Sequence, residues 1–236
     1  MRRSRRYRTI SEKLDAVKTY PLAEAVELVK QNANAKFDES VDVAVKLGVD
    51  PKKQDQMVRG TVSLPHGTGK QVRVLVFCKG DKEAEANEAG ADHVGFEDLA
   101  EKIKEGWLDF DAAVATPDTM SVVGRLGKIL APKGKMPSPK TKTVTFDIAP
   151  TVKALKAGRI NYRTDKTGNV HALVGKVSFE PTQLVENVRA FVAELVRAKP
   201  ATAKGTYLRN IGLSSTMGPG FRVDVRELTE VARKGA

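Results

Sequence analysis

Alternating apolar and polar positions predict an extended strand over residues 40–50. Its odd positions are apolar, namely Val41, Val43, Val45, Leu47 and Val49. Asp42 and Lys46 occupy even positions. Successive side chains of a strand point to opposite faces, so one face of this strand meets a core and the other is polar. Upstream, apolar residues at helical spacing predict helices over residues 11–20 and 21–34, the second behind Pro21.

The middle of the chain has a different pattern. Its apolar runs are nearly continuous, as in strands buried on both faces, and they alternate with helical segments. The expected order is a strand over 72–78, helices over 81–89 and 97–105, a strand over 111–115 and a helix over 118–129. Such alternation indicates βαβ units and a largely parallel sheet.

The last third of the chain has the same kind of hydrophobic pattern as the first, with half-buried strands and amphipathic helices. Strands over 159–164 and 169–178 flank Asp-Lys-Thr-Gly, a hairpin-turn sequence, and a long helix over 181–199 follows. Further strands are expected over 207–213 and 221–225. We therefore predict an α/β plus α+β fold. A discontinuous α+β domain comprises residues 1–66 and 159–236, and a Rossmann-like α/β domain, residues 67–158, is inserted into it.

Charge points to the kind of partner. The 236-residue chain carries a net charge of +11, and the two segments of the discontinuous domain account for nearly all of it. Polyanions are the natural partners of such a surface. The arginine-rich start, MRRSRRYR, is either a solvated end or an arm that orders on nucleic acid. No signal-like apolar core follows it, and no apolar run reaches about 18 residues, so we expect a cytoplasmic protein without a membrane partner.

Sequence motifs for catalysis are weak. The glycine-rich segment 66–71 has Val72 where a dinucleotide fingerprint needs glycine, and Lys70 lacks the spacing of a phosphate-binding P-loop. The single cysteine, Cys78, lies in an apolar run, and the three histidines are isolated from one another. We expect no catalytic residue, cofactor or metal. A nucleotide-dependent enzyme using the α/β insert is the alternative, and a DNA-binding protein is a third possibility.

Seven motifs, in order along the chain, resemble the ribosomal protein L1 family of the large subunit. They are AKFDESV, LGVDPKKQDQMVRGTVSLPHGTGK, ATPD, ILAPKGKMPSPK, GRINYRTDKTGNVHALVGK, KGTYLRN and STMGPG. The resemblance implies a structural protein of the mobile stalk near the tRNA exit site, bound directly to large-subunit rRNA. It also implies help in releasing deacylated tRNA from the exit site and repression of its own operon through the mRNA leader. The implied protein is a monomer when free, and it is ribosome-associated beside other large-subunit components.

The resemblance also implies which residues contact RNA. These are Lys36, Phe37, Ser40, Lys166, His171, Thr216, Met217 and Gly218. Lys46 and Lys204 are added as phosphate contacts, which position the protein on the RNA without reading its base sequence. Glycine would permit close backbone approach to a shallow RNA groove, while a methionine lies against a sugar or base. The competing interpretation is that Phe37 and Met217 close the end of the core. A second basic strip in the insert comprises Arg125, Lys128, Lys133, Lys135, Lys140 and Lys142.

Overall fold

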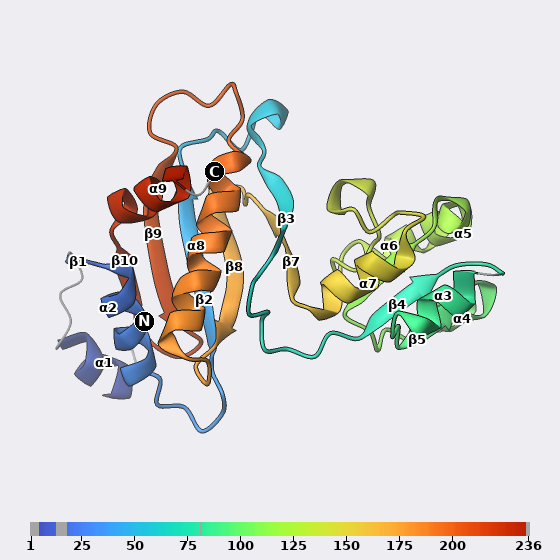
Figure 1. The fold of residues 1–236 in the computed structure, drawn as a ribbon, viewed down its shortest axis with the longest axis horizontal. Coiled ribbons are helices and arrows are strands. Elements are labelled where there is room, and N and C mark those ends of the chain that lie inside the picture. The colour runs from blue at the N-terminus through green and yellow to red at the C-terminus, as the bar shows by residue number, and fades with distance from the viewer. Residues whose placement is uncertain (1–4, 13–17, 81, 235–236) are drawn as a thin grey trace. The chain divides into compact units, whose positions relative to one another are not determined.

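The fold is a computed structural model that describes residues 5–12, 18–80 and 82–234. Contacts between Cα atoms divide the chain into two compact units. Unit 1 combines Met1–Gly69 with Ile160–Ala236, and unit 2 is Lys70–Arg159. Figure 1 traces the chain through both. The mixture of sheets and helices confirms the predicted α/β class of fold.

A five-stranded sheet in the order β1-β10-β9-β2-β8 organises unit 1. The strands are β1 (Thr19–Tyr20), β2 (Ser40–Leu47), β8 (Asn169–Lys176), β9 (Leu208–Ser215) and β10 (Gly220–Val223). β2 runs antiparallel to both β8 and β9. The helices are α1 (Arg5–Glu12), α2 (Leu22–Gln31), α8 (Pro181–Arg197) and α9 (Val225–Lys234). A separate pair joins β3 (Arg59–Ser63) to β7 (Arg159–Arg163), and a short 3-10 turn spans Gln54–Gln56.

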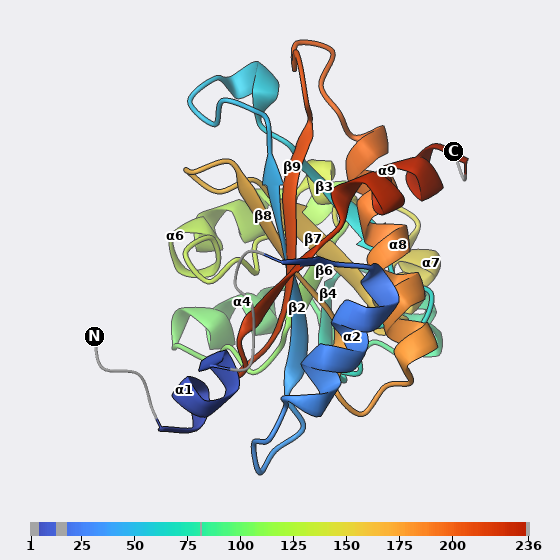
Figure 2. The same cartoon turned by 90° about the vertical axis from the view of Figure 1, so that its left-hand side faces the viewer.

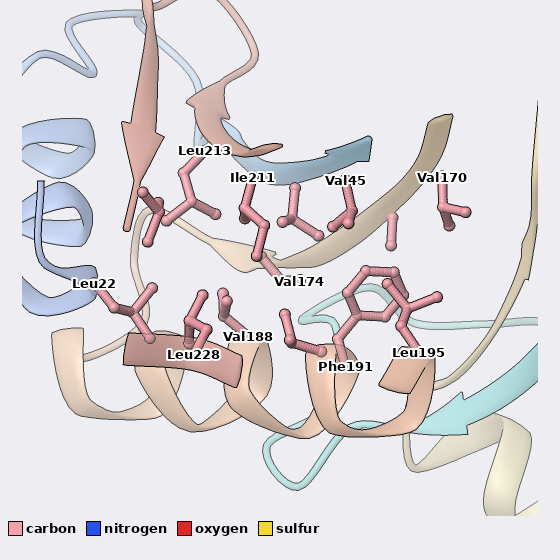
Figure 3. Packing of buried hydrophobic residues seen from close by; sticks show 14 of the residues in the cluster. Leu22, Val45, Val170, Val174, Val188, Phe191, Leu195, Ile211, Leu213 and Leu228 are labelled. Atoms are coloured by element: carbon pink, nitrogen blue, oxygen red, sulfur yellow. The ribbon is translucent and has the colours of Figure 1, made fainter. Parts of the chain in front are cut away.

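The core of unit 1 lies between the sheet and its helices. Figure 2 shows α2, α8 and α9 on one side of the sheet. The odd-numbered residues of β2 point toward these helices, as their alternation predicts, and all four are buried. Figure 3 shows Val45 of β2 facing the apolar stripe of α8, on which Val188, Phe191 and Leu195 are labelled. We call the opposite side of the sheet its outer face.

Unit 2 contains a parallel three-stranded sheet in the order β5-β4-β6. The strands are β4 (Val74–Phe77), β5 (His93–Gly95) and β6 (Ala112–Ala115), and the longer helices are α3 (Lys82–Glu88), α4 (Glu97–Lys104) and α7 (Ile148–Lys156). Every residue of β4 is buried. Leu75 and Phe77 pack in one apolar cluster, and Val74 and Val76 pack in a second cluster on the other face of the sheet. Burial on both faces accounts for the continuous apolar run in the sequence.

The helix predicted over 118–129 is wrong as a single element. The structure has four short helical segments instead, alternately 3-10 and α: Pro117–Thr119, α5 (Met120–Val123), Gly124–Leu126 and α6 (Gly127–Leu130). A further 3-10 turn spans Pro139–Thr141. Two glycines stand at the junctions, and glycine in a helix interior costs about 1 kcal/mol relative to alanine. The apolar spacing is therefore kept while the helical hydrogen bonding is interrupted.

Both ends of the chain differ from expectation. The first helix is Arg5–Glu12 rather than residues 11–20, and Thr19–Tyr20 forms a strand parallel to β10. Residues 1–4 and 13–17, within the predicted arm and helix, lie outside the described residues. The C-terminal tail has a structural role that its sequence did not reveal. In α9, Leu228 is buried, and Glu227 Oε2 accepts a hydrogen bond from the Leu22 amide at 3.2 Å at the start of α2.

The predicted hairpin over residues 159–178 forms only at its turn. Asp165 and Asn169 close the turn through the Asp165 amide, which donates to the Asn169 carbonyl at 2.8 Å. Beyond one antiparallel bridge between Thr164 and Val170, β7 leaves β8 and pairs with β3. The sequence marks the turn correctly, but strand partners depend on which edges the tertiary fold brings together.

The buried hydroxyl of Tyr207 allows a test of what an unpaired polar group costs the stability of unit 1. Tyr207 is 8% exposed, and its hydroxyl has no hydrogen-bond partner among the residues that the structure describes. Burial also raises the pKa of this phenol. Removing an unpaired buried hydroxyl recovers its desolvation cost, so Tyr207→Phe should leave the free energy of unfolding unchanged or raise it by about 1 kcal/mol. Urea denaturation checks this, with Tyr207→Ala as the control that loses about 3 kcal/mol through a cavity. A loss above about 1 kcal/mol in the phenylalanine variant would contradict the assignment.

Candidate nucleic-acid interface

The turn between β9 and β10, residues 216–219, is attached to the first residue of β2. We call it the Met217 turn. The Ser40 amide donates to Thr216 Oγ1 at 3.0 Å, and the Thr216 amide donates to the Ser40 carbonyl at 3.0 Å. Two residues separated by 176 positions in the sequence thus form a reciprocal pair. The predicted contacts Ser40, Thr216, Met217 and Gly218 are brought together at this end of the sheet.

Glu39 joins this turn to the preceding loop, residues 32–39, which we call the Lys36 loop. Its side chain is buried, with 2% of the residue exposed. One carboxylate oxygen accepts from the Ala35 amide and the other from the Met217 amide, both at 2.9 Å. The carboxylate therefore holds the loop and the turn in one arrangement. Glu39 was not among the predicted residues, because an acidic residue next to Asp38 carries no sign of burial in the sequence.

Phe37 and Met217 project from these two segments into solvent. They are 55% and 51% exposed, among the few large apolar side chains that are exposed in the described part of the chain. The alternative that they close the end of the core is therefore wrong. Both side chains are therefore accessible to a partner at this end of the sheet.

Gly218 has an intramolecular reason to be glycine. A Cβ at this position would lie 2.4 Å from Ser215 Oγ, a buried hydroxyl without a hydrogen-bond partner in the described part of the chain. Close packing within the turn thus requires glycine, whether or not RNA approaches.

This contact predicts the effect of substitution at the turn. Gly218→Ala should lower the free energy of unfolding by about 1–3 kcal/mol through overpacking. Adding Ser215→Ala should recover most of that loss, because Ser215 Cβ would lie at 3.6 Å, an ordinary van der Waals distance. Urea denaturation of the four members of this cycle measures the coupling. Independent effects of the two substitutions would contradict the packing account.

Lysines occupy both ends of β2. At the Ser40 end, Lys36 is exposed, and Lys176 Nζ donates to Ser40 Oγ at 3.0 Å. Lys176 was not among the predicted contacts, although it is the last residue of the motif GRINYRTDKTGNVHALVGK. At the far end, Lys46 donates to the Thr167 carbonyl, and Lys166 is exposed on the same turn. Lys204 is also exposed, in the segment that leads into β9.

The turn at residues 165–168, which we call the Asp165 turn, is held by one carboxylate. Asp165 Oδ1 accepts from the Asn169 amide at 2.7 Å and from the Thr167 amide at 2.8 Å. These bonds, the Asn169 amide foremost, hold the pKa of Asp165 well below its usual range. The carboxylate supports the folded turn at neutral pH, and this support is lost as the pH falls through the lowered pKa. Gly168, at φ +82°, completes the turn in a conformation that favours glycine.

His171 lies on the outer face between the two ends of β2. It pairs in register with Ala44, and its Nε2 is 3.7 Å from Asp165 Oδ2. The predicted contact residues therefore form two groups, one at each end of β2, with His171 between them. Six residues separate Ser40 from Lys46, and a strand rises about 3.4 Å per residue, so the groups lie roughly 20 Å apart.

One residue of the predicted second basic strip in unit 2, Lys135, directs its ammonium group into unit 2 itself. Lys135 Nζ donates to the Leu108 and Phe110 carbonyls at 3.0 and 2.5 Å and lies over the Phe110 ring. Lys135 therefore helps to hold unit 2 together. The other five residues are exposed: Arg125, Lys128, Lys133, Lys140 and Lys142.

Signs of catalysis are few in the described part of the chain. Within it, no group of three or more His, Cys, Asp or Glu side chains could hold a metal ion. Burial raises the pKa of Cys78 to about 11, which keeps this thiol protonated and a poor nucleophile. Over the same residues, no helix is long and apolar enough to cross a membrane.

Comparison with known proteins relates the chain to ribosomal proteins. A model of the Ribosomal protein L1p/L10e family matches residues 29–219, which include both groups of predicted contacts. The chain is also 54% identical over 233 residues to the large ribosomal subunit protein uL1 of Protochlamydia amoebophila (strain UWE25), covering 99% of each sequence. A ribosomal protein family is not a family of enzymes, which confirms that prediction. The chain belongs to the ribosomal protein L1p/L10e family, as its motifs predicted.

Proposed function

We propose that this protein is a structural constituent of the large ribosomal subunit that binds large-subunit rRNA directly through unit 1. One observation carries the proposal: Phe37 and Met217 are exposed, yet the buried carboxylate of Glu39 ties the Met217 amide to the Ala35 amide of the loop that carries Phe37. A surface held in place before its partner arrives loses less entropy on binding. The protein then works on ribosomes in the cytoplasm.

Each part of this surface suits a different part of RNA. The Phe37 ring can stack on an unpaired base, and the Met217 thioether can lie against a ribose. Exposed lysines at both ends of β2 neutralise phosphates along the same RNA. The 20 Å between the two groups suits a folded RNA element better than one extended nucleotide strand, because phosphates on two sides of a helix can be reached together.

The wider role that we propose follows from the same surface. Bound to rRNA through unit 1, the protein forms the mobile stalk near the tRNA exit site and takes part in the release of deacylated tRNA. The remaining basic strip of unit 2 offers further phosphate contacts to rRNA or tRNA. A leader in the protein's own operon mRNA that offers the same folded element competes for unit 1 and represses translation. Free of RNA, the protein is a monomer.

Removing the two apolar anchors tests this proposal. The double variant Phe37→Ala, Met217→Ala should bind a large-subunit rRNA transcript roughly tenfold to a hundredfold more weakly, since stacking contributes about 1–3 kcal/mol per base. The slope of log affinity against log salt should stay unchanged, because neither substitution alters charge. Filter binding or electrophoretic mobility shift at several salt concentrations measures both quantities.

Phe146 provides a matched control. It is 54% exposed, like the anchors, but it belongs to unit 2. Phe146→Ala should leave rRNA affinity within about twofold. Equal weakening by the control and the double variant, or none by either, would overturn the proposed surface. Competition with duplex DNA in the same assay separates an RNA-binding from a DNA-binding protein.

A further inference from the structure

Unit 2 has a surface pocket that the proposed function does not use. Its volume is about 480 Å³, which lies within the range typical of ligand sites in proteins. The lining residues come from β5, from α4 and its C-terminal end, and from the loop that follows: His93, Leu99, Lys102, Glu105 and Trp107. All of them belong to unit 2, so the pocket is a candidate binding site of that unit on its own.

Trp107 gives this pocket an aromatic wall. Its ring meets the His93 ring nearly at right angles, with the centroids 4.8 Å apart, and lies 5.7 Å from the Phe110 ring. These contacts hold the indole in place while leaving it partly exposed. The indole N–H donates no hydrogen bond to any residue that the structure describes, and its nitrogen is accessible to solvent. A partner therefore finds an aromatic ring and an unused donor in the same place.

The charge near the pocket is opposite to that of the chain as a whole. Residues 67–120 contain twelve acidic and six basic side chains, which gives this segment a net charge of −6 in a chain of +11. On α4, Asp98, Glu101 and Glu105 recur at intervals of three and four residues, which places them along one side of the helix. All three are exposed, and the ion pairs in the described part of unit 2 involve other carboxylates. Their negative charge is therefore available to a partner.

These features restrict the chemistry of that partner. Carboxylates repel phosphates, so the acidic side of α4 disfavours RNA. A guanidinium ion, by contrast, stacks on aromatic rings and offers five N–H donors to carboxylates. An arginine side chain can therefore meet Trp107 and Glu105 together. A backbone carbonyl of the same peptide can accept from the indole N–H.

We propose that this pocket, together with the acidic side of α4, binds an arginine-rich segment of another protein. One arginine side chain lies against Trp107 and pairs with Glu105, and neighbouring cations of the segment pair with Asp98 and Glu101. Lys102 lines the same pocket and opposes a cationic partner, so it limits the affinity. The inference goes beyond the proposed function and does not depend on it, because every residue involved belongs to unit 2.

The single tryptophan of the chain makes the pocket directly observable. Titration of the full-length protein with an oligoarginine peptide should change Trp107 fluorescence until the site is saturated, although the protein as a whole is cationic. An oligolysine peptide of equal length should bind about threefold more weakly, because an ammonium group lacks the planar fork that stacks on a ring.

Charge substitutions should act in opposite directions. The triple variant Asp98→Asn, Glu101→Gln, Glu105→Gln should bind oligoarginine about tenfold more weakly, because three exposed ion pairs are lost. Lys102→Gln should bind it about twofold more tightly, because a repulsive charge is removed. Glu230→Gln is the matched control, since it removes an exposed negative charge from unit 1, and its affinity should stay within about twofold of that of the natural protein.

Trp107→Phe separates the role of the indole from that of charge. Phenylalanine keeps an aromatic ring in the core contacts but loses the N–H and stacks less well on cations, so affinity should fall about threefold. Fluorescence anisotropy of a labelled oligoarginine peptide measures this variant, which has no tryptophan.

Several results would overturn the inference. They are an unchanged Trp107 fluorescence with oligoarginine, equal affinities of the triple variant and Glu230→Gln, and failure of Lys102→Gln to tighten binding. Quenching of Trp107 by single-stranded oligouridine, with no response to oligoarginine, would assign the pocket to nucleic acid and overturn it too. These titrations contain no rRNA, so failure of the protein to bind rRNA would remove the proposed function and leave this inference standing.

Discussion

Replacement of Glu39 by alanine is expected to lower the free energy of unfolding of unit 1 by about 3 kcal/mol. The substitution removes the carboxylate that accepts from the partly buried Ala35 and Met217 amides, and losing the acceptor of a desolvated donor costs about 1–3 kcal/mol. It also releases the Met217 turn from the Lys36 loop. Affinity for large-subunit rRNA should therefore fall as well, although Glu39 itself is buried and would not touch RNA. Urea denaturation and rRNA binding measure the two effects.

Two variants sharpen this prediction. Glu39→Gln keeps one acceptor oxygen and should lose roughly half as much stability as Glu39→Ala. Glu24→Ala removes an exposed carboxylate from α2, which forms a surface ion pair with Lys18 at 3.9 Å, and should change stability by about 0.5 kcal/mol or less. If Glu39→Ala bound rRNA like the natural protein while losing stability, the tether would be structural only. The link between Glu39 and the RNA surface would then be wrong.

Replacement of Asn187 by alanine should be the most costly single polar substitution in unit 1, at about 3 kcal/mol or more. Asn187 is fully buried on α8, within an otherwise apolar face. Its Nδ2 donates to the Val174 carbonyl at 2.7 Å and to the Gly67 carbonyl at 3.0 Å, and its Oδ1 accepts from the His66 amide at 3.1 Å. Alanine removes these hydrogen bonds from one buried and two partly buried backbone groups, and their desolvation costs add to the lost packing.

Hydrogen exchange of unit 1 peptides measures this loss, and the single tryptophan provides an internal reference. Trp107 belongs to unit 2, so its fluorescence reports on the unfolding of that unit. Asn161→Ala, at an exposed position of β7, is the matched control and should cost about 0.5 kcal/mol or less. Exchange rates in Asn187→Ala that match those of the control would show that the three hydrogen bonds add nothing to stability.

Local sequence patterns were sufficient to predict helices and strands whose formation depends on neighbouring residues alone. Valine alternation predicted β2 and its buried face, and the spacing of Leu184, Val188 and Leu195 predicted α8. These periods follow from backbone geometry, which each segment carries by itself. The exposed Phe37 and Met217 were singled out by their motifs, yet local sequence alone left open whether they face the core or solvent.

The tertiary structure decided what depends on contacts between distant segments. Glu39 meets the Met217 amide across 178 positions, and Lys176 meets Ser40 across 136. Nothing in either neighbourhood marks these partners, because a polar side chain shows its role only when folding supplies a donor or acceptor. The choice of β3 as partner for β7, and the docking of α9, are of the same kind. The sequence by itself determined the periodic elements and the family. The tertiary contacts between distant segments determined which polar groups hold the proposed RNA surface in place.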